Sequence, residues 1–240
     1  MKKDHVKAAT EAGAFALLRL KAKALVQWIA QTSNFKLYEL PLVKLSYISF
    51  GVTLAALAWV KLSGETWAEY GLRGMKSKIR LVAASLFLIF IVLAYSVFIA
   101  PLVDTYVLET FGGTPTQAAD TFKDVVGNLS LFLFVMPFIW IFAAFGEEFF
   151  YRGFLMTKIA RAFGQGRSAW VAAVLIQAFL FGLAHSYQGP AGMVGTGMTG
   201  LIYGFATLAF GRSLLPAMIT HGVIDMLGFS LLYLGLMETS

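Results

Sequence analysis

The sequence has no cysteine and few charged residues for its length. Without cysteine the chain cannot form a disulfide, a thiolate metal site or a cysteine nucleophile, and its redox compartment is left undetermined. Only 13% of its 240 residues are charged, whereas 58% are hydrophobic. A soluble domain carries about twice that charged fraction. Together with a mean hydropathy of +0.73, this composition predicts an all-α, polytopic helical membrane protein.

The N-terminal residues also lack the features of a secretory signal. Residues 1–13 contain neither an apolar core nor a small-residue cleavage site, so we expect membrane insertion to depend on internal spans. The net charge is +6, which in a soluble protein would raise nucleic acid as a partner. In a membrane protein, basic cytoplasmic loops and anionic lipids explain the charge more simply. We therefore expect membrane lipids, and no nucleic acid, among the partners.

Hydrophobic runs predict about six transmembrane helices after an N-terminal segment at residues 1–40. Residues 12–31 have helical periodicity, but Arg19, Lys21 and Lys23 in the middle argue against a span. We expect an amphipathic helix on the membrane surface, with a helix packed against the rest of the protein as the alternative. A single membrane domain at 41–240 holds the expected spans, which are 42–60, 81–103, 128–163, 168–186, 191–210 and 214–237.

The charges of the loops indicate part of the orientation. The loops at 61–80 and 152–167 are basic and are expected in the cytoplasm, whereas the acidic loop at 104–127 is expected outside. The residues before the first expected span are also basic. Both flanks of that span therefore look cytoplasmic, and the topology of the N-terminal region is not decided by charge.

Six ionisable residues stand out because they lie inside the last four expected spans. In chain order they are Glu147, Glu148, Arg152, His185, His221 and Asp225. An ionisable group in a span costs roughly 3 kcal/mol on insertion scales, and such groups usually mark functional sites. Three different helices contribute to this set, which indicates a constellation rather than a scatter.

Helix geometry lets these groups meet. The third and fourth spans form an antiparallel hairpin with its turn near Gln165. Glu147 and His185 each lie about 27–30 Å along their helices from that turn, and so at a similar depth. Glu148 and Arg152 in the third span are four residues apart and share a helix face, as do His221 and Asp225 in the sixth. Glu147 and Glu148 differ in direction by about 100°, which predicts two roles for the two acids.

Groups of these types can together hydrolyse an amide. A carboxylate and an imidazole on opposite sides of a cavity can hold a water molecule and take its proton. A second imidazole can donate a hydrogen bond to the developing oxyanion. Taken singly, each group has a structural explanation, because a Glu–Arg pair can hold helices together and a histidine can bond a backbone carbonyl. The convergence of three helices favours a function.

The same residues form three ordered motifs: EExxxR at 147–152, FxxxH at 181–185 and HxxxD at 221–225. On successive apolar helices these motifs resemble the CPBP family of CAAX proteases and bacteriocin-processing enzymes, the family of the type II CAAX prenyl endopeptidase. The resemblance covers about residues 128–235. Residues 1–127 share little more than hydropathy with the family.

The resemblance implies an intramembrane glutamate endopeptidase. Glu147 and His185 would activate the water, and His221 and Asp225 would form the oxyanion hole. Glu148 and Arg152, the other two charged residues of EExxxR, would fix the positions of the helix and of the base. Asp225 departs from the Asn of the eukaryotic enzymes and, when ionised, cannot donate a hydrogen bond, so it could instead orient His221. We expect no cofactor, although an older view of the family makes these residues zinc ligands and keeps a zinc-dependent variant open.

The expected function is therefore cleavage of a peptide bond in a bacterial inner membrane. The substrate would be a peptide or protein, either lipid-modified or not, cut near a membrane-associated C-terminus or in a short leader peptide. The main alternative is a non-catalytic membrane scaffold or immunity factor that uses the polar cluster to bind a partner, since motifs do not fix function. A proton-coupled transporter is disfavoured because the sequence lacks paired broken helices in matching halves.

Overall fold

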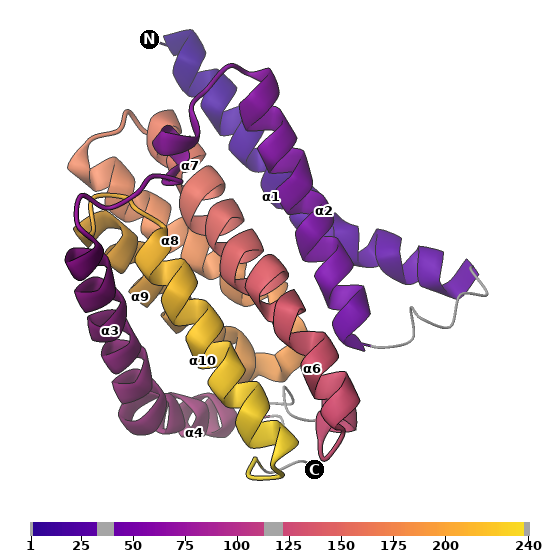
Figure 1. The fold of residues 1–240 in the computed structure, drawn as a ribbon. Coiled ribbons are helices and arrows are strands. Elements are labelled where there is room, and N and C mark those ends of the chain that lie inside the picture. The colour runs from indigo at the N-terminus through magenta and orange to yellow at the C-terminus, as the bar shows by residue number, and fades with distance from the viewer. Residues whose placement is uncertain (1, 33–40, 113–121, 238–240) are drawn as a thin grey trace.

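The computed structural model describes residues 2–32, 41–112 and 122–237, with the side chains of residues 2 and 20 and of residues 22–49 excepted (Figure 1). In these ranges the chain is helical and contains no strand, which confirms the all-α prediction there. The long helices are α1 (Lys2–Thr32), α2 (Pro41–Leu62), α3 (Lys78–Ala94), α4 (Ala100–Phe111), α6 (Leu129–Phe138), α7 (Met156–Ala162), α8 (Arg167–Ala184), α9 (Gly189–Ala209) and α10 (Leu215–Tyr233). Short 3-10 turns are η2 (Trp67–Tyr70), η4 (Lys123–Val125) and η6 (Ser186–Gln188), and π-helical segments are η3 (Tyr95–Ile99) and η5 (Ile139–Leu155).

Four continuous helices are long and apolar enough to cross a membrane. They are Lys78–Phe111, Leu129–Ala162, Arg167–Ala184 and Leu215–Tyr233. The other two expected spans, 42–60 and 191–210, are also helical and correspond to α2 and α9. In α2 the described side chains begin at Phe50, and the apolar stretch that they cover, Phe50–Leu62, is shorter than a span. The helices predicted from hydropathy are therefore present, and four of them meet the length and composition of a span.

The second span is longer than predicted and changes direction. We expected it to end at 103 and a polar loop to follow, but the helix continues to Phe111. The π-helical segment η3 lies between α3 and α4, Pro101 is in the first turn of α4, and Figure 1 shows α4 running across the foot of α3. Both a π-bulge and a proline bend helices. The loop prediction was therefore wrong for 104–111, and its part at 113–121 lies outside the described residues.

The third span is one helix, Leu129–Ala162, whose middle part is the π-helical segment η5. At its end the N–H of Met156 bonds the carbonyl oxygen of Tyr151, five residues back. Pro137 lies just before η5 and removes a backbone donor there. Since π-helical segments are frequent at functional sites, it is relevant that η5 contains the whole EExxxR motif.

Close packing of α8 against α9 positions the end of α8. A Cβ atom on Gly182 would lie 2.6 Å from the carbonyl oxygen of Met193, and one on Gly204 would lie 2.8 Å from the Val174 side chain. Only glycine allows such backbone contact between helices. The short η6 turn then joins the two helices, so that residue 185 is held at their junction. On the other side, α10 lies between α3 and the α6–η5 helix (Figure 1).

The N-terminal helix packs against the rest of the protein over its described side chains. It contacts α2 and α7 along its length, Ala12 is buried, and the Phe15 ring meets the Phe154 ring edge-on at 4.7 Å. This packing agrees with the alternative of a docked helix. A location at the membrane surface stays a prediction, and the side chain of Lys23 lies outside the described residues.

Candidate active site

The site surrounds a cavity of about 410 Å³ to which η5, the end of α8 and α10 all contribute. Glu147, His185, His221 and Asp225 line this cavity. The other two predicted residues, Glu148 and Arg152, are fully buried behind the cavity wall. The volume lies within the usual range for ligand pockets, roughly 300–1,000 Å³. The structure thus brings the six predicted residues together, with four at the cavity surface and two below it.

Glu147 and His185 face each other across a short gap. The distance from Glu147 Oε2 to His185 Nε2 is 4.0 Å, and each side chain is 12% exposed. The other ring nitrogen of His185 lies 2.8 Å from the carbonyl oxygen of Phe181. Because a carbonyl only accepts, Nδ1 is the donor in this bond, and Nε2 of the neutral ring is left as an acceptor. A gap longer than a direct hydrogen bond between two polar groups suits a bridging water molecule.

Glu148 points away from Glu147 and ties three helices together. Its Oε1 atom lies 3.1 Å from Arg152 Nη1 and 2.8 Å from His221 Nδ1, and the carboxylate and guanidinium are both fully buried. The guanidinium also lies over the Phe181 ring, 4.1 Å from its centroid. These contacts join η5 to α10 and α8. The two adjacent acids therefore have different partners, as their angular separation predicts.

His221 is held on both edges and on one face. Its Nδ1 faces Glu148, and its Nε2 lies 3.5 Å from Asp225 Oδ2. The Tyr203 ring stacks on the imidazole with centroids 5.4 Å apart and an interplanar angle of 17°. Both ring nitrogens thus have a carboxylate acceptor, and the ring plane is fixed by packing. Asp225 meets His221 as their spacing of four residues predicts.

The sequence did not indicate one further contact, which comes from the N-terminal helix. Arg19 Nη2 lies 3.9 Å from Glu147 Oε1, and the Arg19 side chain is only 12% exposed. Arg19 counted as an argument against a span, and no motif or spacing linked it to the third span. The only signal was its position as a cation in an otherwise apolar stretch.

The rest of the cavity lining contains both polar and aromatic side chains. Among the polar ones, the Thr196 hydroxyl donates to Gln188 Oε1 at 2.8 Å, and Gln188 Nε2 donates to the Tyr187 hydroxyl oxygen at 3.2 Å. The aromatic ones include Phe122, Phe138, Phe142 and Phe229. An occupant of this cavity would therefore find both hydrogen-bonding groups and apolar rings.

The arrangement does not fit a zinc site. Among the described residues, no three His, Asp or Glu side chains lie together as ligands for one ion. A protein zinc site needs three or four such ligands at about 2 Å. Glu148 is instead bound to Arg152 and His221. Hydrolysis of a peptide bond by these side chains can be described without a metal.

With this geometry established, comparison with known families is informative. Residues 129–227 match the family described as type II CAAX prenyl endopeptidase Rce1-like. The match supports the CAAX protease family for this part of the chain. The match includes all six predicted site residues and agrees with the motif range of about 128–235. Neither a search of curated proteins nor one of solved structures found a match.

The match to the Rce1-like family supports a CAAX-type protease, a hydrolase that acts on peptide bonds. Its substrates are accordingly peptides or proteins. Four helices capable of crossing a membrane, together with this family, make it an integral membrane protein. The residues that perform the reaction and the sequence that is cleaved are finer questions than the family match answers.

Proposed function

We propose that this Rce1-like protease hydrolyses its peptide bond with a water molecule activated between Glu147 and His185. The observation that supports this most strongly is the 4.0 Å separation of Glu147 Oε2 and His185 Nε2 at the wall of a cavity. A carboxylate base must lie within hydrogen-bonding reach of the proton that it takes, directly or through one water. A water molecule between these two atoms meets that condition.

In the first step, Glu147 takes a proton from the water, and the water oxygen forms a bond to the carbonyl carbon of the substrate. The carbonyl π electrons move to its oxygen, which becomes an oxyanion. His221 lines the same cavity. Its Nδ1 is bound to Glu148, so its Nε2–H, which lies 3.5 Å from Asp225 Oδ2, is the donor proposed to turn to this oxyanion and stabilise it. In the second step the C–N bond breaks, and the proton held by Glu147 passes to the leaving nitrogen. No covalent enzyme intermediate forms.

Asp225 has an indirect role in this proposal. Its Oδ2 atom lies 3.5 Å from His221 Nε2, so the carboxylate can orient the imidazole without contacting the substrate. Glu148 fixes the opposite edge of the same ring. Since both acids act through His221, the Asp at position 225 is compatible with an oxyanion hole in which the imidazole is the donor.

The cavity also suggests how a substrate binds. The aromatic residues of the lining suit an apolar side chain or a lipid chain, and the polar residues suit peptide N–H and C=O groups. We infer a substrate cut near a membrane-associated C-terminus or in a short leader peptide, in a bacterial inner membrane. Matched prenylated and unprenylated peptides distinguish the two kinds of substrate.

The experiment is a cleavage assay with purified protein in lipid vesicles, using a peptide library and the matched prenylated peptides. Glu147→Gln should abolish cleavage. Glu109→Gln is the matched control, because Glu109 is an exposed acid on α4 and should leave the rate unchanged. Cleavage by Glu147→Gln at the wild-type rate would refute the proposed base. Comparative peptidomics of membranes and secreted material with the two variants would then identify physiological products.

Two further outcomes would replace the proposal. A cellular phenotype that survives both Glu147→Gln and His185→Ala would favour the scaffold or immunity factor. Loss of cleavage on chelation, with recovery on added zinc, would favour the zinc-dependent variant. Activity that persists after chelation, with substoichiometric zinc, is the result that we expect.

A further inference from the structure

One face of α1 follows the helix that carries the proposed base, in the opposite direction. Near the start of α1, His5 Nδ1 lies 2.7 Å from the carbonyl oxygen of Arg161. Farther along, the Phe15 ring meets the Phe154 ring at 4.7 Å. As residue numbers rise on α1, the numbers of their partners fall. The two helices are therefore aligned in an antiparallel register.

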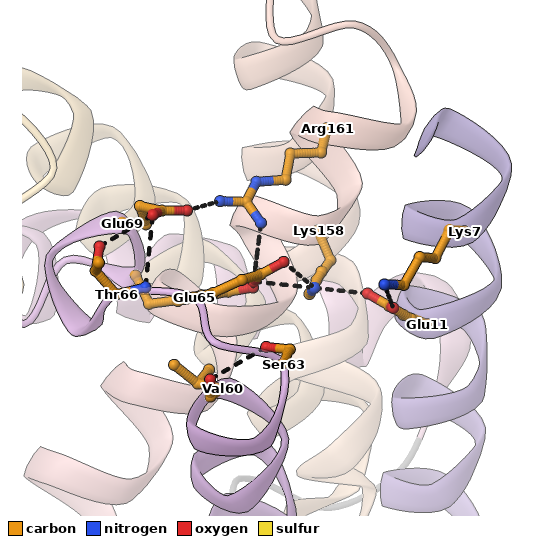
Figure 2. Close-up of polar contacts among 10 residues, drawn as sticks. Lys7, Glu11, Val60, Ser63, Glu65, Thr66, Glu69, Lys158 and Arg161 are labelled. Atoms are coloured by element: carbon orange, nitrogen blue, oxygen red, sulfur yellow. Dashed lines mark hydrogen bonds and ion pairs between the residues drawn. The ribbon is translucent and has the colours of Figure 1, made fainter. Parts of the chain in front are cut away.

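A buried charge cluster fixes this register (Figure 2). Lys158 Nζ lies 2.5 Å from Glu11 Oε2 and 3.3 Å from Glu65 Oε2. The side chains of Lys158 and Glu11 are only 2% and 8% exposed. Arg161 binds the same Glu65 at 3.0 Å. A buried charge is tolerated only when it is paired, so displacement of α1 would cost Lys158 its shortest ion pair.

This register places Arg19 next to Glu147, the proposed base. Residues 11, 15 and 19 are spaced by four and share one helix face. Arg19 therefore follows Glu11 and Phe15 along the contact and reaches Glu147 Oε1 at 3.9 Å. The other carboxylate oxygen of Glu147 faces His185. The Glu147 carboxylate thus lies between a guanidinium on one oxygen and an imidazole on the other.

We propose that Arg19 is a positioning residue for Glu147 and that the Glu11–Lys158 ion pair fixes the position of Arg19. This inference depends on the proposed function, in which Glu147 is the base. The guanidinium attracts Oε1 across 3.9 Å, so that Oε2 is directed toward the water. Arg19 acts through Glu147, and its loss should therefore lower kcat while leaving KM nearly unchanged.

The test measures kcat and KM in lipid vesicles for Arg19→Gln, Arg19→Lys and Lys21→Gln. Misplacement of a catalytic group by 1 Å costs about 100-fold, so we expect a roughly 10- to 100-fold lower kcat for Arg19→Gln. Arg19→Lys should restore most of it because the charge is kept. Lys21 is exposed on the same helix, and Lys21→Gln should behave as wild type.

A second pair of variants tests the anchor. Glu11→Gln weakens the contact with Lys158 and should lower kcat in the same direction. Lys7→Gln is its control, because Lys7 is 68% exposed and lies 3.8 Å from the same Glu11. If Arg19→Gln does not fold, the kcat values of Glu11→Gln and Arg19→Lys decide the question.

The outcomes separate this inference from the function on which it depends. If Glu147→Gln is inactive and Arg19→Gln has wild-type kcat, the positioning role is overturned and the proposed function stands. Higher activity in Arg19→Gln would also overturn it, because the guanidinium would then restrain the base. If Glu147→Gln itself keeps full activity, the proposed function fails first.

Discussion

Replacing Arg152 by methionine should destabilise the protein strongly because it leaves a buried carboxylate without its cation. Glu148 and Arg152 are both fully buried, with 3.1 Å between Oε1 and Nη1. Removing one partner of a buried ion pair costs about 3–5 kcal/mol. His221 stays 2.8 Å from the same carboxylate oxygen and compensates in part. We therefore expect a loss at the low end of that range, about 3 kcal/mol of unfolding free energy.

Removing both charges should be less harmful than removing the cation alone. In Glu148→Gln/Arg152→Met no charge is stranded, and the glutamine oxygen can still accept a hydrogen bond from His221. For the double variant to be less harmful, the coupling free energy between the two substitutions must exceed the cost of Glu148→Gln alone, so it is expected at about 3 kcal/mol, the upper end of the range for residues in contact. The double variant should thus be more stable than Arg152→Met.

The assay is reversible unfolding in mixed detergent micelles with increasing denaturing detergent. Arg80→Met is the control, because Arg80 is exposed and its loss should change the unfolding free energy by less than about 0.5 kcal/mol. The reasoning would be wrong if Arg152→Met stayed within about 1 kcal/mol of wild type, well below the cost of a broken buried pair. A double variant less stable than the single one would also contradict it.

Three further predictions follow from other parts of the structure. Gly182→Ala would place a Cβ 2.6 Å from a backbone oxygen of α9. It should cost about 1–3 kcal/mol of unfolding free energy, measured in the same micelles. Cleavage should also be lost, because the clash shifts residue 185. Asp225→Asn should keep cleavage within about tenfold of wild type, since an amide still bonds His221, whereas Asp225→Leu should lose more than that. Burial tends to raise the pKa of Glu69, but hydrogen bonds from Thr66 and Arg161 bring that pKa below its ordinary value of 4.5. The stabilisation from Glu69 is therefore present above pH 4.5 and is lost as the pH falls below it, so Glu69→Gln should reduce the acid dependence of the melting temperature.

Local helix geometry is why several contacts among the candidate site residues could be predicted from the sequence. The spacing of four residues gave the pairs Glu148–Arg152 and His221–Asp225, and both contacts are present. Glu147 and His185 lie at similar distances along their helices from the turn near Gln165, which predicted one depth for both, and they lie 4.0 Å apart. These predictions need only the pitch of a helix and the position of a turn, which sequence patterns indicate well.

The features that were missed depend on tertiary packing. Nothing in the local pattern of residues 12–31 indicated that Arg19 would contact the third span, because α1 docks through the ion pair of Glu11 with Lys158, far along the chain. The π-helical segment η5 was likewise not predicted, and the helix to Phe111 was placed in a loop because its acids, Asp104 and Glu109, suggested one. Hydropathy responds to composition and not to such packing.

The most direct test of the mechanism is the ratio of kcat/KM between wild type and Glu147→Gln on one defined peptide in the same vesicles, at equal melting temperature. General base catalysis contributes about 10²- to 10⁴-fold, so the account predicts a loss of at least about 100-fold. A ratio near one in a folded variant would show that the carboxylate at this position takes no proton from the attacking water.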